Sequence, residues 1–444
     1  NLSDDVHWVH GNHDFAFGAR IGLSKIDNGG PYEAPGLFTF NKNAGDGAAS
    51  FLLGAISSFT QGAGTYTALR NTFLGFYGQD NWKVNRRLSL NYGVRYEPYL
   101  PWKERDGRVE QFDAQAYASG TTSSIFVNAP KGLLFPGDAG MPKNGYKEIY
   151  SNVEPRFGFA LDVFGDGRTA LRGGAGIFYD TRTPAINYSN GSAVTPFGVS
   201  VSLTNPAGPF SDPYRGITNP FPSPVTLPHD GAFPLPVQVY TFDTDGNFPP
   251  PVTYQWNFGI EQAFTQNLFG RIAYVGSHSS HLTTFIEENP AQANDSGTDG
   301  PRRFPEYSTI TDINDGSNAI YHSLQATLQQ RLAHGLTVLA NYTWSKSIDD
   351  LPYDWGDGLS YVYPLTYPNF RSLDRGRSDF DRRHVFSGSY VWKLPKLTGH
   401  AVAVRAIANG WETTGIVQLQ SGDALTVIST ADTSGTALGQ DRAE

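Results

Sequence analysis

The chain has 444 residues and no cysteine, which excludes a disulfide framework and thiolate metal sites. Its formal net charge of -9, without any basic stripe, argues against nucleic acid as a partner. Aromatic residues reach 14% and charged residues only 17%, yet no apolar stretch approaches the roughly 18 residues of a membrane helix, so a helical membrane protein is excluded and a β-barrel is not.

Alternating apolar and polar residues predict β-strands along the whole chain. In the segment 88–97, every second residue is apolar and would face one side of a sheet. Two segments are irregular: 72–82 would place Asp80 on the apolar face, and 268–275 fits neither register. The predicted strands include 15–24, 72–82, 88–97, 157–163, 254–261, 268–275, 323–329, 336–344, 386–392 and 411–419.

Connections of two contrasting lengths separate these strands. Short connections are expected at 11–12, 83–87, 165–167, 265–267 and 332–335, with a longer one at 395–409. Long polar connections are expected at 99–150, 180–251, 278–318, 346–382 and after Ser421. Short turns at one end and long loops at the other are typical of an outer-membrane barrel, whose long loops are extracellular.

The fold class predicted from this pattern is all-β: an antiparallel up-and-down transmembrane β-barrel with long extracellular loops. Two strands per short turn give about twelve strands, which would be part of a larger barrel. We expect residues 1–444 to form a segment of one barrel domain in the bacterial outer membrane. A soluble β-sandwich or propeller also alternates, but strands of about ten residues and segregated loop lengths favour the barrel.

Several phrases resemble the barrels of TonB-dependent transporters of the Oar-like type, which carry a carboxypeptidase-regulatory-like domain before their plug. They are Phe-Tyr-Gly-Gln-Asp-Asn-Trp at 76–82, Leu-Arg-Gly-Gly-Ala-Gly-Ile-Phe-Tyr-Asp at 171–180, Tyr-Thr-Trp-Ser-Lys-Ser-Ile-Asp-Asp at 342–350, and the charged run at 374–384. In this order they extend over most of the chain. The resemblance implies an outer-membrane transporter.

The resemblance further implies a barrel of about 22 strands with a plugged lumen. The plug would precede Asn1, further strands would follow Glu444, and the chain would be a segment of the complete transporter. TonB would then be a partner only through a plug that this chain does not contain. Transport would belong to the intact protein.

The proline-rich segment 181–251 is the longest connection between strong strands. Its prolines cannot donate to a β-ladder, so we expect an extended or irregular segment that is only partly ordered. One interpretation is a capture loop whose aromatic residues meet a ligand. The other is a passive shield against phage and proteases. The ligand candidates in this segment are Phe210, Tyr214, Phe221 and Tyr240.

The run 374–384 contributes two further ligand candidates, Arg375 and Arg377. It could bind anionic lipopolysaccharide or a ligand, but the favoured interpretation is a cluster in which nearby aspartates neutralise the arginines. His7, His10 and His13 suggest a metal site only if the turn at 11–12 folds them together, and we expect none. Gly173, Gly174 and Gly176 lead into more strand rather than a helix, so they do not predict a phosphate loop.

No nucleophile or paired-carboxylate motif is present in the sequence, and Glu287 with Glu288 is expected in a loop without a placed partner. We therefore expect no enzymatic activity and no cofactor. The expected partners are outer-membrane lipid and an unknown small solute or oligosaccharide. Two alternatives to a transporter remain open: a secreted carbohydrate-binding β protein, and a surface adhesin that moves no substrate.

Overall fold

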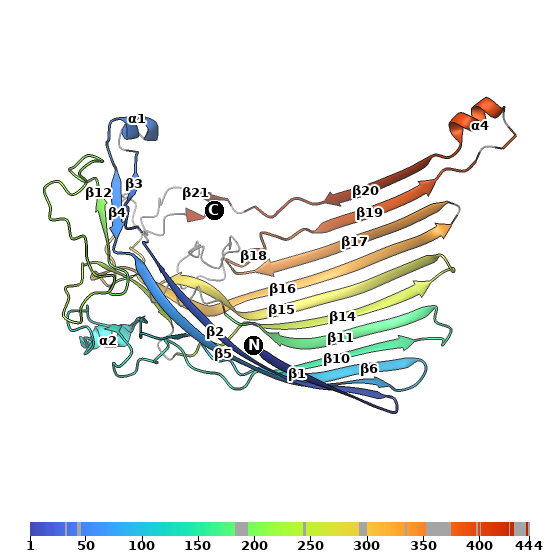
Figure 1. Ribbon diagram of the computed structural model, residues 1–444, viewed down its shortest axis with the longest axis horizontal. Coiled ribbons are helices and arrows are strands. Elements are labelled where there is room, and N and C mark those ends of the chain that lie inside the picture. Colours follow the sequence, from blue (N-terminus) through green and yellow to red (C-terminus); the bar gives the residue numbers. More distant parts are fainter. Residues whose placement is uncertain are drawn as a thin grey trace.

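Twelve strands follow one another in a single antiparallel sheet in the computed structural model (Figure 1). Each strand pairs with the next along the chain, as the sequence predicts for an up-and-down arrangement. The structure describes residues 1–31, 33–41, 46–182, 194–242, 246–292, 300–333, 335–351, 374–396, 398–399, 401–425, 427–429 and 441–442. The twelve strands are β1 (Leu2–His10), β2 (His13–Gly30), β5 (Thr65–Lys83), β6 (Leu88–Tyr96), β10 (Val153–Asp162), β11 (Thr169–Tyr179), β14 (Val252–Ala263), β15 (Leu268–Glu287), β16 (Tyr307–Ala333), β17 (Leu336–Asp349), β19 (His384–Lys393) and β20 (Glu412–Gln420).

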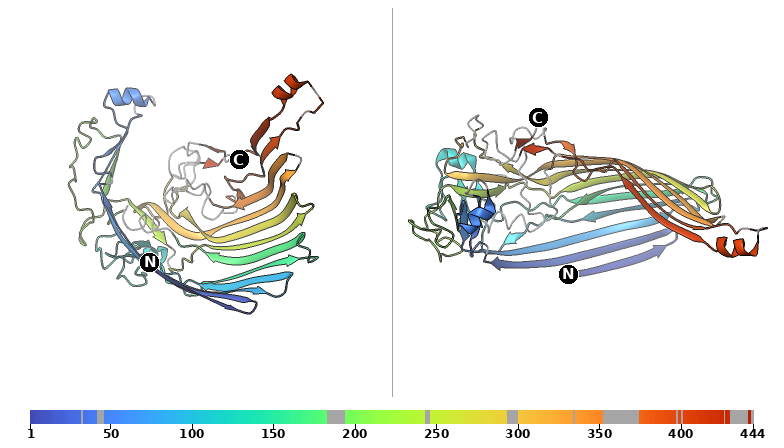
Figure 2. Two further views of the ribbon diagram at one scale, coloured as in Figure 1. Left: turned by 45° about the vertical axis from the view of Figure 1, so that its right-hand side comes forward. Right: turned by 90° about the horizontal axis from the view of Figure 1, so that it is seen from above.

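The sheet is curved into a trough whose two edge strands, β1 and β20, lie apart (Figure 2). Within the described part of the chain, each edge strand pairs with one neighbour. Register partners share a face, so the apolar residues of successive strands form one continuous apolar face. Phe157, for example, pairs with Tyr92 on one side and with Ala175 on the other. The opposite face carries the polar residues of the alternation.

The short connections all lie at one end of the sheet, which we call the short-turn end. They follow the predicted positions, with Gly11 and Gly335 at the positive φ angles that tight turns require. The longest of them, between β19 and β20, contains the helix α4 (Val402–Ala408), which the sequence pattern did not predict. The other end of the sheet, where the long connections gather, is called the loop end.

Two strands run far beyond the predicted boundaries at the loop end. Strand β15 continues to Glu287 and β16 begins at Tyr307, so the connection expected at 278–318 shrinks to residues 288–306. Glu287 therefore ends a strand, 4% exposed, and the expectation that it lies in a loop was wrong. The predicted strands end where the alternation of apolar and polar residues ends. Beyond that point, β15 and β16 enter the packed loop end, where residues on both faces of a strand can be buried.

The proline-rich segment also differs from its prediction. Residues Ser200–Thr204 form β12, which pairs antiparallel with β4 (Ser58–Gly62). Residues Val237–Phe242 form β13, which pairs parallel with β16. The expectation that this segment builds no ladder was wrong, because its prolines cluster before and between these two proline-free stretches.

The remaining elements are short and lie mostly at the loop end (Figure 1). Strands β3 (Leu37–Thr39) and β12 flank β4 in a three-stranded sheet, while β7 (Lys103–Glu104) and β18 (Gly376–Arg377) extend the large sheet. Two small pairs are β8 (Gln111–Phe112) with β9 (Leu133–Leu134), and β21 (Ile428–Ser429) with β22 (Asp441–Arg442). Two one-and-a-half-turn helices, α1 (Gly47–Leu52) and α2 (Ala114–Ser119), complete the described loops.

Asp80 lies on the apolar face, as its position in the alternation predicts, and is only 3% exposed. Its Oδ2 accepts a hydrogen bond from the Tyr92 hydroxyl at 2.7 Å and lies 2.6 Å from His13 Nδ1. The His13 ring stacks on the rings of Phe15 and Trp82. Oδ2 of the carboxylate thus has one partner from each neighbouring strand, while Oδ1 is buried without a hydrogen bond to any described residue, so the charge among apolar residues is compensated on one oxygen.

The glycine-rich run at 173–176 lies inside β11, and the neighbouring strand explains one of its glycines. A Cβ at Gly173 would lie 2.6 Å from the Phe159 ring of β10. The same relation holds between Gly276 and the Trp256 ring. These small residues let aromatic rings lie across the adjacent strand.

Candidate functional site

The polar face of the sheet carries a network of opposite charges. Arg172 Nε lies 3.0 Å from Glu261 Oε2 across strands β11 and β14. Arg156 pairs with Glu154 at 2.8 Å along β10. Such partly exposed pairs add little stability individually. They make the wall hydrophilic while leaving no strong net field, so this face suits a water-filled interior.

The described long connections pack into a body at the loop end, which we call the loop cap: residues 99–149, 194–242, 246–251, 284–292 and 300–313. Strand β13 lies at its centre. Burial of large aromatic side chains is the main source of its stability, at about 2–3 kcal/mol for each fully buried ring. One core consists of Phe112, Phe126, Ala129, Leu133, Phe135, Phe197, Phe233, Val237, Val239, Phe304, Tyr307 and Ile310; the other of Tyr99, Tyr146, Val194, Tyr240, Phe242, Phe248 and Ile313.

Tyr240 belongs to the second of these cores. It is 6% exposed, and the Gln238 side chain donates a hydrogen bond to its hydroxyl at 3.3 Å. The side chain therefore packs inside the loop cap. The number of aromatic residues in the segment does not reveal which of them are buried, so the sequence could not distinguish this core tyrosine from the exposed aromatic residues near it.

The other three aromatic candidates come together outside the cap cores. Phe210 packs edge-on against Phe38 with ring centroids 4.7 Å apart, and Tyr214 packs edge-on against Phe59 at 5.4 Å. Phe221 packs against the same cluster. Residues of 35–61 and 210–219 line an open hollow of about 660 Å³, in which Phe210 is 46% exposed. The three candidate residues of the proline-rich segment thus pack against the β3–β4 hairpin. The sequence pattern did not indicate this contact.

The two arginine candidates lie on the short strand β18 and beside it. Arg377 Nε donates to Asp381 Oδ2 at 2.7 Å, and Asp381 is 2% exposed. Arg375 is exposed. Arg382 pairs with Asp423, outside the charged run. Arg377 is therefore neutralised by an aspartate of the same charged run, as the favoured interpretation of the sequence expects. Arg382 instead has its counterion in the segment after β20.

A chamber of about 550 Å³ lies against the polar face where the sheet meets the loop cap. Strand residues Arg20 and Phe73 line it together with Tyr99, Trp102 and Arg182 from the loops. Its volume falls in the range of small-molecule sites, about 300–1,000 Å³. Aromatic rings, hydroxyls and two guanidinium groups converge there, so the chamber can hold a solute of several rings or polar groups.

Arg182 is the most deeply buried charge of this chamber, at 4% exposure. Its guanidinium lies 3.5 Å from the centre of the Phe248 ring and donates to the carbonyl of His281 at 3.1 Å, and its backbone carbonyl accepts from Trp102 Nε1 at 3.3 Å. Burial lowers the pKa of this guanidinium to about 10, against the raising effects of Tyr99, Asp315 and Tyr146, so it stays charged at neutral pH. No sequence motif marks Arg182, because its partners come from distant loops.

Glu110 gives the loop cap a pH dependence. It is fully buried in the cap, and burial raises the pKa of its carboxyl well above the usual range, opposed by the Tyr240 backbone amide that donates to Oε1 at 3.4 Å. The folded state therefore binds this proton more tightly than the unfolded state does. The contribution of Glu110 to the free energy of unfolding is complete at pH values below the pKa that the carboxyl has in the unfolded chain. As the pH rises from that value toward the higher pKa of the folded state, this contribution falls by about 1.4 kcal/mol per pH unit.

We expect amides of β13 to exchange hydrogen faster, after correction for intrinsic rates, as pH rises above the ordinary glutamate range. Glu110→Gln should remove this dependence, because the amide is neutral at every pH. Hydrogen exchange measured by mass spectrometry on both forms checks the prediction. Identical pH profiles for the two forms would contradict it.

The histidines near the first turn do not form a metal site in the described structure. His10 lies opposite His13 in the register, while His7 lies on the other face of β1, and His13 is held by Asp80. The described residues contain no group of three or more His, Cys, Asp and Glu side chains placed to bind a metal ion. They also contain no helix that is long and apolar enough to cross a membrane.

A family model described as "Outer membrane beta barrel domain" matches residues 1–444. No curated protein matches the chain. Similar solved structures include the outer membrane transporter YddB from Escherichia coli, with 13% identity and a TM-score of 0.42 over 94% of this chain and 45% of that one. The pyoverdine receptor FpvA from Pseudomonas aeruginosa bound to pyoverdine has 12% identity and a TM-score of 0.40, over 88% and 38%. The alcaligin receptor FauA from Bordetella pertussis has 12% and 0.36, over 93% and 48%. The chain spans less than half the length of each of these proteins.

Proposed function

The chain belongs to the family of outer membrane beta barrel domains, and on that basis we propose that it is part of the barrel of a TonB-dependent transporter whose extracellular loops capture a scarce solute. In the bacterial outer membrane the apolar face contacts lipid, the polar face lines the interior and the loop end is extracellular. In the described part of the chain both edges of the sheet, β1 and β20, lack a second neighbour, and an edge cannot remain unpaired in hydrocarbon, so further strands would close the barrel.

The chamber beneath the loop cap is the observation that carries this proposal. It lies on the interior face at the extracellular end, where a captured solute would first meet the barrel. Trp102 and Phe73 offer aromatic surface, and Arg20 and Arg182 offer charge-assisted hydrogen bonds. An adhesin would also need exposed loops, and the outer hollow around Phe210 is compatible with one, but an adhesin has no use for an interior chamber.

The test compares cells that express the complete gene with cells that lack it, by mass spectrometry of solutes depleted from the medium, with and without a protonophore. We expect depletion of at least one solute only in energised, expressing cells. Trp102→Ala and Phe73→Ala should slow this depletion about tenfold or more at limiting solute, since loss of a central aromatic contact commonly costs about 2 kcal/mol.

Tyr150→Ala, an exposed loop tyrosine that does not line the chamber, is the matched control and should deplete normally. Expressing cells that adhere to surfaces or other cells but deplete no solute in an energy-dependent way would favour the adhesin. Normal uptake by both chamber variants would remove the chamber from the transport path.

A further inference from the structure

Four basic or imidazole side chains form a row on the apolar face near the loop end: His278 on β15, His322 on β16, Lys346 on β17 and His384 on β19. His322 and Lys346 are direct register partners, and His384 is paired with Trp344, two residues from Lys346. Direct partners have Cβ atoms about 5 Å apart and diagonal neighbours about 7–8 Å. His322, Lys346 and His384 are exposed. A face that contacts lipid rarely carries such groups without a partner.

Two of the imidazoles are oriented by tyrosines on the same face. Tyr274 Oη lies 2.8 Å from His322 Nδ1, and Tyr342 Oη lies 2.8 Å from His384 Nδ1. Each pair of rings is also stacked. A tyrosine hydroxyl that donates to Nδ1 places the proton of the neutral imidazole on Nε2. Among the described residues, no hydrogen bond involves Nε2 of either ring, so both can donate outward to an anion.

The acids at this end of β17 do not face the row without a partner: Asp349 lies on the opposite face from Lys346, and Asp350 Oδ1 accepts a hydrogen bond from the Asn318 backbone amide at 2.6 Å. Arg377 lies beside Ile348 in the register, and its guanidinium pairs with the buried carboxylate of Asp381. The row around Lys346 therefore keeps its positive character. An anion between Lys346 and His322 can accept hydrogen bonds from the ammonium group and from Nε2 at once.

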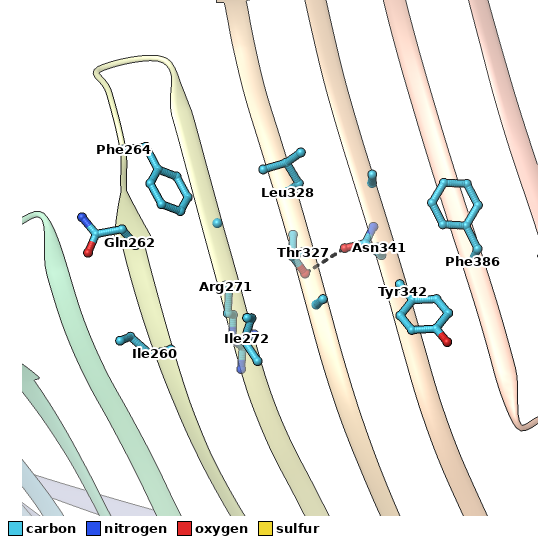
Figure 3. Close-up of a pocket in the computed structure, with 13 residues that line it drawn as sticks. Ile260, Gln262, Phe264, Arg271, Ile272, Thr327, Leu328, Asn341, Tyr342 and Phe386 are labelled. Atoms are coloured by element: carbon cyan, nitrogen blue, oxygen red, sulfur yellow. Dashed lines mark hydrogen bonds between the residues drawn. The ribbon is translucent and has the colours of Figure 1, made fainter.

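A groove lies on the same face closer to the short-turn end, separated from His322 and Lys346 by Leu324 and Trp344, and crosses β14, β15, β16, β17 and β19. Its volume is about 500 Å³, and its lining is almost entirely apolar. Gly270, Ala326 and Ala340 form the floor, where larger residues would fill the space. Figure 3 shows the walls, which are the side chains of Ile260, Phe264, Ile272, Leu328, Tyr342 and Phe386.

The height of the row matches a membrane interface. Lys346 lies ten residues beyond Leu336, the first residue of β17. At about 3.3 Å per residue and a tilt of about 40°, this separation spans about 25 Å, the height of the apolar band of an outer-membrane barrel. The row therefore lies at headgroup level on the extracellular side, and the groove lies within the hydrocarbon. Tyr342 connects the two features, because its hydroxyl contacts His384 of the row and its ring lines the groove.

We propose that this face binds a phosphorylated lipid of the extracellular leaflet, with a phosphate held by His322, Lys346 and His384 and one acyl chain in the groove. The cationic row selects the phosphate through charge-assisted hydrogen bonds. The groove supplies apolar contact that a smooth barrel surface lacks. The inference depends on the membrane position of the family and not on transport, so it can fail or succeed independently of the proposed function.

The test titrates the complete purified protein in detergent with diphosphorylated lipid A and with its dephosphorylated form, and measures dissociation constants by native mass spectrometry. We expect the wild-type protein to prefer the phosphorylated form. Lys346→Gln combined with His384→Gln should weaken its binding about tenfold or more and remove the preference. Ala340→Phe, which fills the groove, should weaken both lipids by the same factor and keep the preference.

Lys393→Gln is the matched control, because Lys393 lies on β19 at the short-turn end, beside Glu412. It should bind both lipids as the wild type does. Inorganic phosphate at the same concentration should not displace the lipid. Equal affinity for the two lipids, unchanged binding by the charge variant, or displacement by inorganic phosphate would each overturn the proposal. So would an Ala340→Phe variant that changes oligomeric state without changing lipid affinity, which would assign the groove to a second copy of the chain.

Discussion

Replacing residues 185–248 by a short Gly-Ser linker is expected to abolish solute uptake by the complete transporter while leaving barrel assembly and surface expression intact. The segment contributes β12 and β13 and, through residues such as Phe197 and Phe233, part of the packed cap core. Without it, the chamber loses the packing that holds its loop residues in place. The strands on either side, β11 and β14, pair with each other directly, so their ladder does not depend on the segment.

The matched control replaces Val402–Ala408, the helix at the short-turn end, with a linker of the same composition. This helix lies far from the loop cap (Figure 1), so uptake and assembly should both persist. Uptake of the depleted solute and protease accessibility at the cell surface are the two readouts. Unchanged uptake after the 185–248 replacement, or a barrel that no longer assembles, would defeat the capture-loop interpretation.

The sheet itself was predictable from the sequence because each strand presents one apolar and one polar face. The period of two is unambiguous in segments such as 88–97, and glycines mark the turns. Membrane strands preserve this signal along their full length, since lipid covers one side and water or polar groups the other. The strand at 72–82 looked irregular only because Asp80 finds its partners, His13 and Tyr92, on two other strands.

The loop cap was not predictable by the same reasoning. Its strand β13 is parallel to β16 and is covered on both sides, so neither period nor turn chemistry reveals it. Tyr240 and Phe210 lie in the same proline-rich segment, yet one is buried in a core and the other half-exposed. Arg182 gains its role only through contacts with residues about 67 to 101 positions away. Such long-range packing depends on tertiary geometry that composition does not encode.

The claim that the apolar face contacts lipid is tested most directly by the stability of two arginine variants of the complete protein, refolded reversibly into lipid vesicles. Val94 lies on the apolar face and is 48% exposed, whereas Asn91, three residues away on the same strand, lies on the polar face and hydrogen-bonds Asn81. We predict that Val94→Arg lowers the free energy of unfolding by about 2–4 kcal/mol if the residue is near the bilayer midplane. Asn91→Arg should cost about 1 kcal/mol, the net value of one hydrogen bond. Equal free energies for the two variants would contradict the account, because they would show that Val94 does not face hydrocarbon.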